Sequence, residues 1–144
     1  MTQATREAVV SCWICGSSEN LTGEHIFKHS DAKMLLGPVS QQDPVFFHTA
    51  KRINKEVGSF KNSVFKFGKI ICAKCNGQIT QPYDRAWDEL SKWLYSNSEK
   101  IEAGKKIRWS NAFPNNTRAK MIDVQLFFSK LMGCCLETTG LNFD

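Results

Sequence analysis

Two pairs of cysteines constrain the fold of this 144-residue chain more than any other feature. Each pair has two residues between its members, and the pairs are Cys12 with Cys15 and Cys72 with Cys75. Thiolates at this spacing wrap around one half of a tetrahedral zinc ion. Gly16 and Asn76 follow the pairs, and both residue types tolerate the left-handed backbone that such turns need. The spacing therefore predicts one structural zinc site with four cysteine ligands, which closes a long loop and stabilises the fold.

A second metal assignment uses the first cysteine pair with two histidines. Cys12, Cys15, His25 and His29 follow the ligand order of a zinc finger with two cysteines and two histidines. Such a finger has about twelve residues between the pairs, whereas nine separate Cys15 from His25 here. The four-cysteine site is preferred because the finger would leave the second cysteine pair without a role. Two further cysteines, Cys134 and Cys135, are expected to be core thiols.

The hydrophobic pattern predicts an α+β fold, with strands first and helices later. Strands are predicted over residues 21–27 and 63–71, with an extended stretch over 44–48 and mixed structure elsewhere in 28–60. Helices are predicted over 84–97 and 117–138, and the lead-in 1–10 is expected to be helical from Thr5. The last helix should bury an apolar stripe made of Val124, Phe127, Phe128, Leu131 and Cys135. Trp87 and Trp93 have helical spacing and should pack in the core.

We divide the chain into a zinc-stapled core, residues 1–97, and a linker with a C-terminal helical extension that packs on it, residues 98–144. No stretch approaches the roughly 18 apolar residues that span a bilayer. The sequence therefore predicts a cytoplasmic protein that does not enter a membrane. Thiols stay reduced in that compartment, which favours metal ligation over disulfides.

Positive charge is concentrated in one segment. The chain carries a formal charge of +5, while residues 51–74 hold seven basic residues and a single acid, Glu56. Such a local excess suits contacts with phosphates, although a solvated basic face is an equal alternative. Lys105, Lys106 and Arg108 form a second basic patch beside Trp109, which we expect to be buried.

A carboxylate and a histidine lie between the cysteine pairs, in the run Glu24-His25-Ile26. Taken in order, the first cysteine pair, this run, and the second pair followed by Asn76 resemble the zinc-stabilised form of the HNH endonuclease family. The resemblance covers residues 12–88. It implies a ββα-metal (HNH) motif built on the four-cysteine zinc site and followed by C-terminal helices.

The resemblance also implies roles for individual residues. His25 matches the general base, Glu24 a ligand of one catalytic Mg²⁺ or Mn²⁺, and Asn76 a residue that braces the loop behind the histidine. Asp84, eight residues after Asn76, is the candidate for a further ligand of that ion. A glycine of the family pattern is missing before Asp84, and Pro82 suggests that a helix breaks or restarts there. Capping of that helix is therefore an alternative role for Asp84.

The chemistry is consistent with these residue types. An imidazole titrates near neutral pH and can deprotonate a water molecule, and hard divalent cations prefer carboxylate oxygens. Neighbouring residues of a strand point to opposite faces. Glu24 and His25 can therefore serve one site only if the strand bulges or ends there.

These features predict a metal-dependent endonuclease that hydrolyses phosphodiester bonds of nucleic acid. By the resemblance the substrate is DNA, duplex rather than single-stranded. Five basic residues are candidates for contacts with the nucleic acid: Lys51, Arg52, Lys66, Lys69 and Lys74. The main alternative is a zinc-ribbon module that binds nucleic acid without catalysis. A third possibility is a protein-interaction module that uses the apolar face of the last helix.

Overall fold

The computed structural model describes residues 10–49, 52–101 and 104–139. Its strands and longer helices follow in the order β1 (Leu21–His25), α1 (His29–Leu36), β2 (Val45–Thr49), β3 (Arg52–Val57), β4 (Lys66–Cys72), α2 (Gln81–Ser96) and α3 (Thr117–Thr139). The fold is mixed α+β, with two small sheets and helices toward the C-terminus, as predicted. The helix expected from Thr5 lies outside the described residues. Among those residues, no helix is long and apolar enough to span a membrane.

A bulged antiparallel ribbon of β1 and β4 lies at the centre of the fold. It runs from Leu21 opposite Cys72 to His25 opposite Lys66, and its register shifts on both sides of Gly23. Each shift leaves an extra residue on β4. Gly23 is required here because an ideal Cβ would lie 2.8 Å from a carbonyl oxygen of β4. β1 ends at His25, and the extra residues of both register shifts lie on β4.

The second cysteine turn leads directly into α2. A π-helical turn, η2 (Cys75–Ile79), connects β4 to this helix. Helix α2 begins at Gln81, three residues earlier than predicted, with Pro82 in its first turn. A proline in the first turn removes no hydrogen bond, because the first amides of a helix have no partner within it. Pro82 therefore marks where the helix starts.

Between β1 and β4 the chain inserts α1 and the β2–β3 hairpin. This insertion has its own small core of Ala32, Val57, Phe60 and Phe65. It is joined to α2 by the indole of Trp87, whose Nε1 donates to Asp31 at 2.6 Å. The sequence pattern predicted only β2 here. Helix α1 buries a single residue and β3 is largely polar, so neither has a clear periodic signal.

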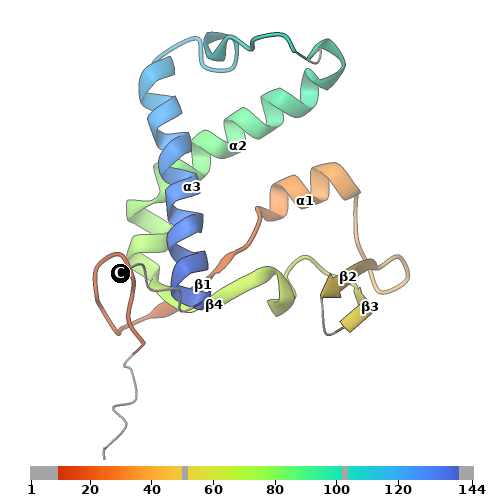
Figure 1. Ribbon diagram of the computed structural model, residues 1–144, viewed down its shortest axis with the longest axis vertical. Helices are drawn as coiled ribbons and strands as arrows, with labels where there is room; N and C mark the ends of the chain where they lie inside the picture. Colours follow the sequence, from red (N-terminus) through yellow and green to blue (C-terminus); the bar gives the residue numbers. More distant parts are fainter. Residues whose placement is uncertain (1–9, 50–51, 102–103, 140–144) are drawn as a thin grey trace, which may run out of the picture.

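Helix α3 crosses α2 and brings its C-terminal half to the β1–β4 ribbon (Figure 1). Trp87 on α2 stacks on Phe127, with ring centroids 5.5 Å apart. The buried face of α3 consists of Val124, Phe127, Lys130 and Cys134. The predicted stripe is wrong at two of its members, since Phe128 is 48% exposed and Cys135 is exposed. Apolar periodicity misplaced the stripe because a lysine occupies one of the buried positions.

Candidate functional site

The four cysteines of the two pairs form one compact cluster. Their sulfur atoms all lie within 4.8 Å of one another, and the Sγ atoms of Cys15 and Cys72 are 3.7 Å apart. Four sulfurs at zinc-bonding distance sit at the corners of a tetrahedron with edges of about 3.8 Å. The donor set therefore fits a zinc ion. His25 and His29 lie outside this cluster, so the alternative zinc-finger set is not brought together.

Local backbone geometry builds the cluster. The amide of Gly16, at a φ of 73°, donates to the Cys12 carbonyl at 2.7 Å and closes the first turn. The amide of Trp13 then donates to Ile70 of β4 and docks the turn on the ribbon. Burial by itself would raise the pKa of Cys12, but hydrogen bonds from nearby backbone amides outweigh it and lower the pKa to about 6. Burial raises the pKa of Cys75, so the thiolate form is favoured first at Cys12.

His25 is half-buried at the end of β1. Its Nε2 is shielded from solvent and has no hydrogen-bond partner in the described part of the chain. Burial lowers the pKa of His25 below its usual 6.5; the charges of Lys66 and His29 act in the same direction, and Glu24 opposes them. The imidazole is therefore neutral at pH 7, which is the form that accepts a proton.

Glu24 and Asp84 come together from different elements, β1 and α2, and meet at a lysine. The Nζ of Lys130, on α3, lies 2.8 and 2.9 Å from the two carboxylate oxygens of Asp84. It lies 3.5 Å from Oε2 of Glu24. Lys130 is only 3% exposed, so this is a buried ion network. Sequence reasoning missed Lys130; its position three residues after Phe127 and four before Cys134 was the available signal.

This network does not fit the catalytic ion that the HNH resemblance implies. Mg²⁺ or Mn²⁺ would need the oxygens that Lys130 already contacts. Lys28 adds a second positive charge, 3.8 Å from Asp84. In the part of the chain that the structure describes, no third histidine, cysteine or carboxylate joins Glu24 and Asp84 to form a potential metal-binding group. As arranged here, the two carboxylates are partners of an ammonium group.

Asn76 contacts β1 at Thr22 and not at the histidine. Its Nδ2 donates to Oγ1 of Thr22 at 3.3 Å, and Thr22 in turn donates to the carbonyl of Ile71 on β4. Asn76 thus ties the second cysteine turn to the ribbon. Its side chain contacts Thr22, three residues before His25 in the sequence.

The basic candidates separate into two groups. Lys66 lies directly across the ribbon from His25, and Lys69 lies across from Gly23. Both are exposed, as is Lys74 in the second cysteine turn. Arg52 begins β3, which pairs with β2 in the separate hairpin. Lys51 and the side chain of Arg52 lie outside the described residues.

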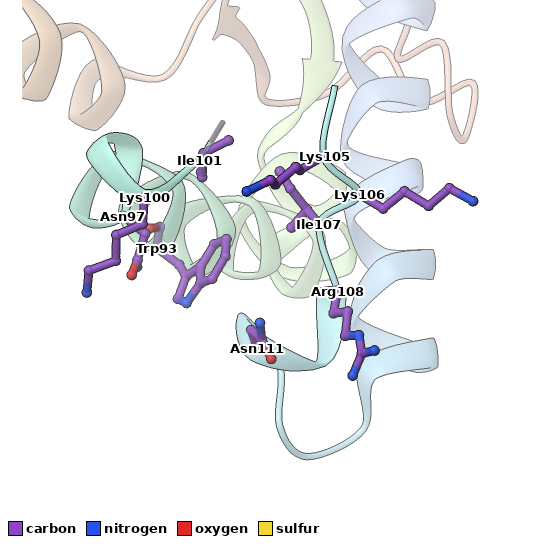
Figure 2. Close-up of a pocket in the computed structure, with 9 residues that line it drawn as sticks. All are labelled: Trp93, Asn97, Lys100, Ile101, Lys105, Lys106, Ile107, Arg108 and Asn111. Atoms are coloured by element: carbon purple, nitrogen blue, oxygen red, sulfur yellow. The ribbon is translucent and has the colours of Figure 1, made fainter. Parts of the chain in front are cut away.

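The second basic patch surrounds a hollow of about 340 Å³ near the C-terminal end of α2. Trp93 lines it, nine residues along α2 from Asp84 and thus about 13 Å further along the helix axis. Figure 2 shows that the side chains of Lys106 and Arg108 extend away from Trp93. Trp109, expected to be buried, is 39% exposed. The patch is therefore separated from Asp84 along α2, and two of its three basic side chains extend away from Trp93 (Figure 2).

Comparisons of this chain with protein-family models, with curated proteins and with solved structures gave no match. Its function has to be inferred from the residues themselves.

Proposed function

We propose that this chain hydrolyses phosphodiester bonds of nucleic acid, with His25 as the general base. DNA is the substrate that the HNH resemblance implies. The observation that carries the proposal is a neutral imidazole at the end of a bulged strand, directly opposite Lys66. A proton acceptor beside a fixed positive charge is what hydrolysis of an anionic ester requires.

The arrangement of elements supports the same proposal. The ribbon of β1 and β4 is followed by α2, with the cysteine cluster joining the turn before β1 to the turn after β4. This is the order of a ββα-metal motif with α1 and the β2–β3 hairpin inserted between its strands. In this proposal zinc binds the two cysteine turns together and takes no part in the reaction.

The reaction follows from the residues around His25. Because Nε2 is shielded, Nδ1 is the nitrogen that takes a proton from the attacking water. The water oxygen bonds to phosphorus, and the bond from phosphorus to the leaving sugar oxygen breaks. That oxygen takes a proton from solvent, and the imidazolium returns its proton to solvent. Lys66 stabilises the charge that develops on the phosphate, and Lys69 and Lys74 hold neighbouring phosphates.

We assign no step to Mg²⁺ or Mn²⁺, because Glu24 and Asp84 are already paired with Lys130. The same network favours the alternative function, a zinc-ribbon module that binds nucleic acid without cutting it. In that alternative the two carboxylates only attach α3 to the ribbon.

Cleavage of supercoiled plasmid separates the two functions. Wild type, His25→Ala and His48→Ala would be compared with and without Mg²⁺, after zinc content and melting curves have been matched. His48 is a suitable control because it is exposed on β2, where its Nδ1 accepts from Asn54. We expect His25→Ala to cut at least about 100-fold more slowly and His48→Ala to cut normally.

Two results would reject hydrolysis by His25. The first is equal cutting by wild type and His25→Ala. The second is a gel shift of DNA by all three proteins without any cutting, which would make the binding module the function.

A further inference from the structure

We propose that Lys130 is the resident cation of Glu24 and Asp84, and that it excludes a divalent metal from these two carboxylates. If the proposed function holds, cleavage should need no divalent ion at these carboxylates, and this consequence rests on the proposed function. The exclusion of metal from Glu24 and Asp84 does not depend on cleavage.

The contacts of Lys130 are those of a cation enclosed by its ligands. Its ammonium contacts both oxygens of Asp84 and lies near one oxygen of Glu24. The side chains of Lys130 and Glu24 are 2% and 11% exposed. Each partner comes from a different element, so β1, α2 and α3 meet at this one charge.

The aliphatic part of the Lys130 side chain is also buried. Its position on α3 belongs to the buried face, between Phe127 and Cys134, and its Nζ lies 5.7 Å from the centre of the Phe127 ring. Moving the ammonium into solvent would leave two carboxylates in a poorly hydrated space. A divalent ion would need the Asp84 oxygens that Lys130 contacts at 2.8 and 2.9 Å, and it would be repelled by the charges of Lys130 and of Lys28, 3.8 Å from Asp84. Lys130 and a divalent ion therefore compete for the same oxygens.

Binding of Mn²⁺ to the zinc-loaded protein tests this directly. Lys130→Met removes the charge and keeps a long apolar side chain. Lys120→Met is the matched control, because Lys120 also lies on α3 but pairs with Glu89 at an exposed position. Free Mn²⁺ is followed by electron paramagnetic resonance, and thermal melts are recorded with and without the ion.

Wild type and Lys120→Met are expected to show no Mn²⁺ site at these carboxylates. Lys130→Met is expected to gain one such site and to melt at a higher temperature when Mn²⁺ is present. Adding Asp84→Asn to Lys130→Met should abolish both effects. Because Lys28 also lies 3.8 Å from Asp84, the double variant Lys28→Met/Lys130→Met is measured beside Lys130→Met. If both folded variants ignored Mn²⁺, the proposal would be overturned.

Wild type alone also tests the proposal, so it stays falsifiable even if Lys130→Met does not fold. Mn²⁺ broadens nuclear magnetic resonance signals of nearby groups. Broadening centred on Glu24 and Asp84 in wild type would show that metal displaces Lys130, and the proposal would fail. These readouts are separate from cleavage, so absence of plasmid cutting rejects the proposed function without altering this outcome.

Discussion

Burial is the largest of the influences that lower the pKa of His25. The charges of Lys66, across the ribbon, and of His29 add to it, and Glu24 opposes them. A lowered pKa means that the ring stays deprotonated to a lower pH than an ordinary histidine. In a pH–rate profile, proposed cleavage that depends on neutral His25 should therefore fall to half its rate at a pH below 6.5.

Lys66→Met should raise the pKa of His25, because one of the positive charges that disfavour imidazolium is removed. The measurement is a nuclear magnetic resonance titration of the His25 ring proton. Lys69→Met is the matched control, since Lys69 lies opposite Gly23 and is not among the charges that act on His25. An unchanged pKa in Lys66→Met, or an equal shift in both variants, would contradict this account of the site.

Helix α3 packs closely against the first cysteine turn. Helix α3 lies so close to Trp13 of the first cysteine turn that a Cβ at Gly133 would collide with the indole ring. Trp13 is bonded through its amide to β4. The packing of α3 on this turn and the ion network at Lys130 therefore hold the same half of the helix against the ribbon.

Gly133→Ala tests the close approach of α3. In an isolated helix this change stabilises by up to about 1 kcal/mol, but here the new methyl group must displace Trp13. We expect a net loss of about 1–3 kcal/mol in the free energy of unfolding, measured with urea. Gly77→Ala is the control, because no atom lies within 4 Å of its added Cβ. Equal or greater stability of Gly133→Ala would show that α3 is not held against Trp13.

At the scale of the whole molecule, the cysteine cluster joins the turn before β1 to the turn after β4, beside the pairing of β1 with β4. Among the described residues, three separate hydrophobic clusters are buried, and one of them combines Cys12, Cys72 and Cys75 with Ile71. A structural zinc contributes binding energy on the order of 10 kcal/mol, which equals the whole stability of a typical domain. The folded state should therefore depend on the metal.

Removal of zinc with a chelator is expected to abolish the cooperative thermal transition, and re-addition should restore it. Cys75→Ser should bind less than one zinc per chain and melt at a lower temperature, as measured by metal analysis and calorimetry. Cys135→Ser provides the control, because Cys135 is exposed and outside the cluster. An unchanged melt of Cys75→Ser would mean that metal does not hold this fold together.

Features that depend on neighbours along the chain were predictable. The spacing within each cysteine pair, the apolar run that forms β4 and the helical period of α2 are local patterns, and each predicted its element to within a few residues.

Features that depend on partners distant in sequence were decided only by the tertiary structure. Lys130 resembles a surface residue in the sequence, yet it is buried because Asp84, 46 residues earlier, and Glu24 neutralise it. Burial of a charge is favourable only when opposite charges surround it, and hydrophobic periodicity contains no information about such partners. The sequence by itself determined the α+β class and the four cysteines that cluster and could hold a zinc ion. The tertiary structure decided that the carboxylates of Glu24 and Asp84 pair with Lys130.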